Sequence, residues 1–255
     1  MKAEGKYIYC VIETKHDRNF GPIGIGGRGD EVLTVGHGDL NVVVSNHPMG
    51  KITANRQNMV GHERVIEEVM KEFDSVLPVR FGTIASSVDE IRNLLDRRSR
   101  EFKCALRDMD HKVELGVKGI WKDMNVVLKQ ISSNSQSIRN LKGQAKGKSS
   151  RSVQTKIEIG QLVKDLLDRK KEDQAQEIVD RLRRTSFDYK LNRTIGDEMF
   201  MNASFLVSKG GEKEFDNTMD ELSDEYEDRM KFLYAGPLPV FNFVSIVIYP
   251  DEWEK

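Results

Sequence analysis

The chain has 255 residues, of which 38% are hydrophobic, so it is long enough for one large domain or two modest domains with a real core. Its 40 basic and 41 acidic side chains give a formal net charge of −1, which provides no overall field for binding nucleic acid or a lipid membrane. No segment approaches the roughly 20 apolar residues that span a bilayer, and residues 1–6 lack the apolar centre of a secretory signal. We therefore expect a cytoplasmic protein whose two cysteines, Cys10 and Cys104, are reduced thiols.

The first third of the chain predicts a sheet covered by a helix. Residues 6–12 alternate in polarity and favour a buried strand. A glycine-rich loop then leads to a hairpin with strands at 32–35 and 40–45. Apolar residues at helical spacing predict a helix from about 55 to 73, capped by Asn55 or Thr53.

The next elements lead to an expected domain boundary. Residues 76–84 predict a strand, and the segment from Ser87 to about 110 predicts one helix. Residues 113–121 alternate again and begin a second domain. We therefore expect an N-terminal α+β domain over 1–112 and a C-terminal domain over 113–255.

The second domain is expected to contain a helical, partly mobile insertion around 123–152. Its residues 132–152 are rich in Ser, Asn, Gln, Gly and Lys and offer few apolar anchors. A long amphipathic helix over 152–185 follows, with a break near 170–173 left open. The remaining pattern predicts a strand at 200–207, a helix at 212–230 and closing strands at 232–235 and 242–248. This order is typical of a modified ferredoxin-like α+β domain.

Two glycine motifs imitate nucleotide-binding loops. Residues 24–29 match Gly-x-Gly-x-x-Gly, but two acidic residues and a strand follow where a helix should begin. Residues 143–149 resemble a P-loop with one residue too few between the glycines. We interpret both as turns or linkers and expect no cofactor.

The polar residues form no recognisable catalytic or metal-binding motif. The five histidines lack the spacing of a zinc site, and His62-Glu63 has no second histidine one turn further on. Residues 108–111 could bind a hard cation weakly, but a polar helix end is the favoured interpretation. No nucleophile or acid and base pair is indicated, so we do not expect an enzyme.

Two segments supply candidate structural or partner-contact residues. In the first, Arg80 interrupts an apolar strand; we favour a structural arginine paired with a carboxylate over a recognition residue. In the second, prolines stiffen a bend between aromatic residues, which either close a sheet or present an apolar edge. The candidates are Arg80, Phe81, Gly82, Gly236, Pro237, Pro239, Phe241 and Phe243.

Four segments together resemble the gas vesicle protein family GvpF/GvpL. They are residues 5–12 (GKYIYCVI), 76–83 (VLPVRFGT), 113–118 (VELGVK) and 233–244 (LYAGPLPVFNFV), and the resemblance spans nearly the whole chain. Leu238 and Val240 depart from the family pattern, which commonly has a tryptophan and a further proline there. The resemblance implies an N-terminal α+β domain and a ferredoxin-like C-terminal domain with a variable region.

The resemblance also implies a function. It suggests an accessory or minor structural protein that associates with gas vesicles and binds the hydrophobic shell protein and other gas vesicle accessory proteins during assembly. The alternative is a small-ligand or nucleotide-dependent enzyme built on a ferredoxin-like domain, because that fold carries many functions.

Overall fold

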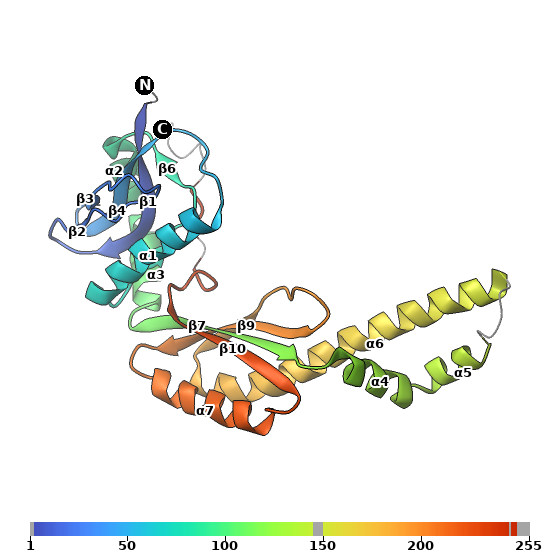
Figure 1. Ribbon diagram of the computed structural model, residues 1–255. Coiled ribbons are helices and arrows are strands. Elements are labelled where there is room, and N and C mark those ends of the chain that lie inside the picture. The colour runs from blue at the N-terminus through green and yellow to red at the C-terminus, as the bar shows by residue number, and fades with distance from the viewer. Residues whose placement is uncertain (1–2, 145–149, 245, 249–255) are drawn as a thin grey trace. The chain divides into compact units, whose positions relative to one another are not determined.

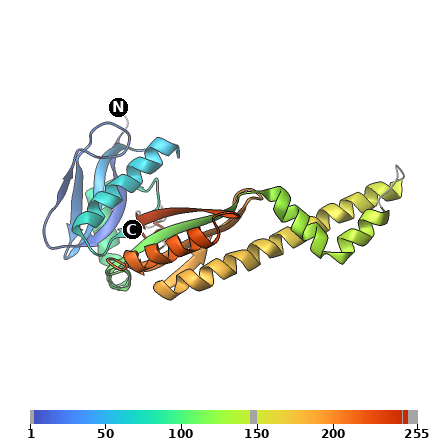
Figure 2. The same cartoon turned by 60° about the horizontal axis from the view of Figure 1, so that its bottom comes forward.

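The computed structural model describes residues 3–144, 150–244 and 246–248 and combines helices with two antiparallel sheets (Figures 1 and 2). The described residues fall into two compact units. The first contains the chain up to Glu114, the segment Leu206–Lys209 and the chain from Gly236 onward. The second contains Leu115–Phe205 and Gly210–Ala235. The expected mixture of helices and sheets is therefore confirmed.

The first unit is built on a six-stranded sheet with the order β2-β3-β4-β1-β5, and β6 also pairs with β1. The strands are β1 (Glu4–Glu13), β2 (Asn19–Gly21), β3 (Val32–His37), β4 (Leu40–Pro48), β5 (Leu77–Pro78) and β6 (Ile84–Ala85). The predicted hairpin is β3 and β4. A shift of register between Ile8 and Cys10 of β1 marks an irregularity in its pairing with β4.

Two hydrophobic clusters cover the two faces of this sheet. Helix α1 (Arg56–Glu72) packs its buried face on the cluster that contains Tyr7, Tyr9 and Cys10. Helices α2 (Val88–Arg97) and α3 (Ser99–Asp108) pack on the cluster that contains Ile8 and Val11. The N-terminus of α1 follows the sequence prediction, because the side chain of Asn55 accepts a hydrogen bond from the backbone of Asn58 at 2.8 Å.

The single helix expected from Ser87 to about 110 is wrong in one respect, because it is interrupted at Arg98. This residue has φ −103° and ψ 16°, ends α2 and precedes α3. Its guanidinium donates to both carboxylate oxygens of Glu101 at 2.8 and 2.6 Å and to the carbonyl of Val247 at 3.0 Å. Side-chain periodicity misses this break, because Leu94 and Leu95 before it and Phe102 after it all face the core.

The strand expected over 76–84 is two short strands separated by a turn. β5 and β6 each pair with β1, and residues 81 and 82 form the turn between them. Gly82 has φ +88°, a left-handed conformation that favours glycine. The turn makes Arg80 exposed and leaves Phe81 half-buried.

A four-stranded sheet has the order β10-β7-β9-β8. Its strands are β7 (Lys112–Trp121), β8 (Asp188–Leu191), β9 (Met199–Ser208) and β10 (Met230–Leu238). Helix α7 (Glu212–Glu225) buries Phe215, Met219 and Leu222. It ends at Glu225, although the sequence predicted a helix that continues to residue 230. The sequence also did not indicate β8, because its side chains are mostly exposed.

Three helices of the second unit connect β7 to η1 (Arg183–Thr185), the short 3-10 turn before β8. They are α4 (Met124–Asn134), α5 (Gln136–Gln144) and α6 (Ser150–Leu182), and Figure 2 shows α4 and α5 lying along α6. Residues 132–144 are therefore helical except at Ser135, which separates α4 from α5, although their polar composition suggested incomplete order. Burial of Ile131 and Ile138 explains the difference. Residues 145–149 of the expected mobile segment lie outside the described part of the chain. They include most of the P-loop-like motif at 143–149. α6 has no break at 170–173.

The closing strand expected over 242–248 is not formed by the described residues there. The chain turns at 240–244, where the backbone N–H groups of Phe243 and Val244 both donate to the carbonyl of Val240. Ile246 then makes a single parallel bridge to Val79. The alternating aromatic pattern predicted a strand, but Ile246 joins the hydrophobic cluster under α2 and α3 instead.

Two expectations from composition can be compared with the described residues. Within them, no helix has both the length and the apolar character needed to cross a membrane. Cys10 is buried and Cys104 is exposed, and both are free thiols, as predicted.

Candidate functional site

A groove of about 530 Å³ opens in the first unit between α1, the turn after β5 and the residues that follow β10. We call it the apolar groove. It is lined by Met59, His62, Glu63, Pro78, Arg80, Phe81, Phe241, Val244, Ile246 and Val247. Its volume is within the roughly 300–1,000 Å³ typical of ligand clefts.

His62 is the buried polar residue of this groove. Its Nε2 lies 3.1 Å from the carbonyl oxygen of Val79, and its Nδ1 lies 2.8 Å from the hydroxyl of Tyr7. Because a carbonyl can only accept, Nε2 carries the proton, and Nδ1 of the neutral ring accepts from Tyr7. The Tyr7 oxygen also accepts from the N–H of Gly82 at 3.2 Å. These bonds fix the turn that carries Arg80 and Phe81 against α1 and β1.

Burial keeps these groups neutral. It lowers the pKa of His62 from 6.5 to about 4, against the smaller opposing effect of the hydrogen bond to Val79. Burial also raises the pKa values of Tyr7 and Tyr9 above their ordinary value. Tyr9 is held by hydrogen bonds with the Ser45 hydroxyl and the Ile25 N–H, both at 2.8 Å. The groove therefore rests on an uncharged, hydrogen-bonded layer.

Two side chains of opposite charge line the apolar groove. Arg80 is exposed and makes no ion pair with any residue of the described part, so the expected structural pairing with a carboxylate is not observed there. Glu63 is half-buried, and desolvation raises the pKa of its carboxyl, with further contributions from Glu67 and Glu114. The lining thus combines apolar side chains with one cation and one carboxyl group.

The structure brings three of the predicted contact residues together in this groove: Arg80, Phe81 and Phe241. Phe241 is 38% exposed, and its ring centre lies 6.0 Å from that of His62. Gly82 lies beside them as the donor to Tyr7. The shared site arises because distant segments meet on the same side of α1.

The other candidates lie away from the groove lining. Gly236 and Pro237 are exposed in β10 and are joined by a cis peptide bond. Pro239 is buried and lines a separate cavity of about 10 Å³. Phe243 is half-buried beside Asn242, whose backbone and side-chain N–H groups donate to the carboxylate of Glu114 at 2.9 and 2.5 Å.

Sequence reasoning missed Met59, His62 and Glu63 as parts of this site. Met59 is one of the apolar residues whose helical spacing predicts α1, which favours a buried position, but it is 53% exposed. For His62 and Glu63, the sequence argues against a zinc site because no second histidine follows one turn further on. Their adjacency in the middle of an apolar helix was the available signal, because a buried histidine needs hydrogen-bond partners that only the fold supplies.

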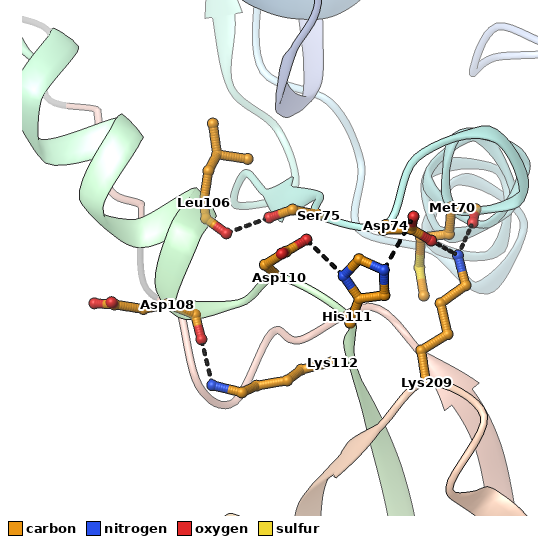
Figure 3. A network of polar contacts seen from close by, with 9 residues as sticks. All are labelled: Met70, Asp74, Ser75, Leu106, Asp108, Asp110, His111, Lys112 and Lys209. Atoms are coloured by element: carbon orange, nitrogen blue, oxygen red, sulfur yellow. Dashed lines mark hydrogen bonds and ion pairs between the residues drawn. The ribbon is translucent and has the colours of Figure 1, made fainter.

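A second polar cluster lies at the other end of α1 (Figure 3). His111, with φ +52°, places its ring nitrogens 2.9 Å from Asp110 and 3.5 Å from Asp74. Lys209 donates to Asp74 at 2.7 Å and to the carbonyl of Met70 at 3.3 Å. No group of three or more possible metal ligands occurs among the described residues. This cluster ties the ends of α1 and α3 to the turn after β9, which agrees with the polar helix end favoured for residues 108–111.

The fold is shared with solved structures of gas vesicle proteins. The crystal structure of GvpF from Microcystis aeruginosa matches with a TM-score of 0.80 at 22% identity and covers 95% of this chain and 99% of that one. The structure of GvpF from Anabaena sp. matches with a TM-score of 0.79 at 23% identity, over 96% and 100% of the two chains. At these identities the likeness shows a common fold.

Sequence comparison then shows the family. Gas vesicle protein F of Nostoc sp. is 26% identical over 201 residues, which cover 77% of this chain and 80% of that protein. Gas vesicle protein F1 of Halobacterium salinarum is 25% identical over 253 residues, covering 98% and 97%. A model of the family described as gas vesicle synthesis protein GvpL/GvpF matches residues 5–245. The chain belongs to this family, which confirms the resemblance of its four segments, and its role is related to gas vesicles.

Proposed function

We propose that this chain is an accessory or minor structural protein that binds the hydrophobic shell protein and other accessory proteins while gas vesicles assemble. The observation that supports this proposal best is the apolar groove with its exposed Met59 and Phe241. Shell subunits expose apolar surface before they polymerise, and a groove of this kind can cover such surface. We place the protein in the cytoplasm, associated with the vesicle.

The proposal extends to domain organisation. The chain order β7, α4 to α6, β8, β9, α7, β10 and the sheet order β10-β7-β9-β8 support a ferredoxin-like domain with a helical insertion between its first two strands. We keep the boundary near residue 112, close to Glu114, where the main segment of the first unit ends. The residues after Gly236 would then return to the N-terminal domain.

We propose that the protein acts by binding rather than by catalysis. The apolar groove contains one neutral histidine whose two nitrogens are both engaged, which leaves it no free position for proton transfer. The rival enzyme hypothesis is tested by a thermal-shift screen with nucleotides and metal ions. A specific ligand at a hundred times its Kd would stabilise the chain by about 2.7 kcal/mol.

The test of the proposed function is co-purification. The tagged full chain is co-expressed with the shell protein and, separately, with each accessory protein, and the retained partner is quantified. Retention of the shell protein, together with loss of vesicles when the gene is deleted, is the expected result. If the intact chain retains no gas vesicle protein and its deletion leaves vesicle formation unchanged, the proposed function is wrong.

A further inference from the structure

We propose that the apolar groove binds an amphipathic α-helix of a partner gas vesicle protein, which places a carboxylate against Arg80 and a cationic side chain against Glu63. This inference rests on the proposed function and specifies the surface and the chemistry of the contact. Three properties of the groove support it: two charged residues without an ion pair among the described residues, backbone groups of residues 78–80 that are already engaged, and exposed apolar side chains.

The two charged residues indicate the polarity of the occupant. Arg80 and Glu63 both line the groove, and neither makes an ion pair with a residue in the part of the chain that the structure describes. Their side chains are also too far apart to pair with each other within the 4.0 Å limit of an ion pair. A partner with a carboxylate and a cation at matching positions would satisfy both, and charge pairs of this kind fix register and orientation.

The backbone around the groove indicates a helix rather than an added strand. Pro78 has no N–H group, and the N–H of Val79 donates to the carbonyl of Tyr9 at 2.9 Å. The carbonyl of Val79 faces His62, and that of Arg80 accepts from the hydroxyl of Thr83 at 2.7 Å. Since these groups of residues 78–80 are already bonded, they offer no partners to the backbone of an extended segment. A helix satisfies its backbone internally.

The apolar lining suits side-chain anchors from such a helix. Met59 is 53% exposed and has a flexible thioether side chain that adapts to different shapes. Phe81 and Phe241 provide aromatic surface, and Val244 and Val247 extend it. A groove of this kind accepts side chains at helical spacing, three or four residues apart.

The test uses two matched pairs of variants in the tagged full chain. Met59→Glu is compared with Val60→Glu, because the two residues are neighbours on α1 and each is 53% exposed, but Val60 does not line the groove. Arg80→Glu is compared with Arg64→Glu, since Arg64 is also exposed and makes no ion pair among the described residues. Circular dichroism and Tm establish that each variant is folded.

We expect Met59→Glu and Arg80→Glu to reduce retention of the co-expressed shell or accessory protein at least about tenfold, as a loss of central contacts does. Val60→Glu and Arg64→Glu should change it less than about twofold. In the partner, replacing one acidic residue of an amphipathic helix by lysine should restore retention by Arg80→Glu. This recovery would identify the residue that faces Arg80.

Two outcomes would overturn the inference. In the first, folded Met59→Glu and Arg80→Glu retain the partner as well as their controls do; the proposed function would then stand, and the contact would lie elsewhere. In the second, light scattering shows that these substitutions convert an oligomer of the chain alone into monomers, so that the groove is occupied by a second copy. Absence of retention by the intact chain instead contradicts the proposed function itself.

Discussion

Tyr7 and His62 are 55 residues apart in the sequence, yet the hydroxyl of one lies 2.8 Å from Nδ1 of the other in the buried layer beneath the apolar groove. The bond joins the central strand β1 to helix α1. Through Gly82, whose N–H donates to the same hydroxyl, it also holds the turn that carries Arg80. The groove therefore depends on a hydrogen-bonded layer that belongs to the core.

Removing the Tyr7 hydroxyl tests this layer directly. We expect Tyr7→Phe to lower the free energy of unfolding by about 1–3 kcal/mol, because the ring is kept while His62 and Gly82 each lose a buried partner. Urea denaturation measures the change. Tyr189→Phe is the control, since Tyr189 is half-buried and its hydroxyl has no hydrogen bond with a described residue. A similar small effect of both substitutions would show that the layer contributes little stability.

The neutral state of His62 predicts a dependence of stability on pH. Burial lowers its pKa from 6.5 to about 4, so the unfolded chain takes up a proton at a higher pH than the folded chain does. The stability that the fold gains from keeping His62 neutral is complete above pH 6.5 and decreases as the pH falls. It is lost once the pH has passed through about 4. The loss amounts to about 3 kcal/mol.

The measurement for His62 is the free energy of unfolding at several pH values between these limits, for the native chain and for His62→Gln. The difference in the free energy of unfolding between the two proteins isolates the effect of His62. Carboxylates with lowered pKa values, such as Asp39 and Glu101, contribute equally to the pH dependence of both proteins. We expect the difference to shrink as the pH falls. Parallel curves would mean that His62 titrates normally in the folded protein.

Replacing each of two glycines of the second unit by alanine should change the stability of the protein in opposite directions. At Gly119 in β7, an added Cβ would overlap the ring of Phe200, which is 2% exposed and whose ring centre lies 5.3 Å from that of Trp121. We expect Gly119→Ala to destabilise the protein by about 1–3 kcal/mol. Beyond the adjoining backbone of α6 itself, a Cβ at Gly160 meets no atom of the described residues within 4 Å, so Gly160→Ala should stabilise the protein by about 0.5–1 kcal/mol. Thermal unfolding of both variants checks the pair, and equal shifts would contradict the packing.

The two thiols should differ in reactivity. Cys104 is exposed, whereas Cys10 is buried in β1 and burial raises its pKa. A disulfide reagent such as Ellman's reagent should therefore label one thiol rapidly in the folded protein and both after denaturation. Cys104→Ser should abolish the rapid phase. A rapid phase that survives this substitution would show that β1 is accessible.

Local patterns in the sequence were sufficient for several elements. Apolar residues at helical spacing after Asn55 predicted α1, because both the cap and the buried stripe are local properties. The β3–β4 hairpin followed from alternation on either side of a glycine turn. Periodicity could not reveal the break at Arg98, since the helices before and after it face the same core and the guanidinium bonds to a carbonyl 149 residues away.

The sequence by itself determined the family, the mixed α and β class, two reduced thiols and three of the residues that line the groove, because motifs and residue types carry that information along the chain. Tertiary structure decided that Arg80, Phe81 and Phe241 meet Met59, His62 and Glu63. It also decided that the residues after β10 leave the four-stranded sheet to bridge Val79. The physical reason is that burial and hydrogen bonding between residues 55 and 149 positions apart outweigh local preference. Neither the partners of His62 nor the groove can therefore be predicted from neighbouring residues.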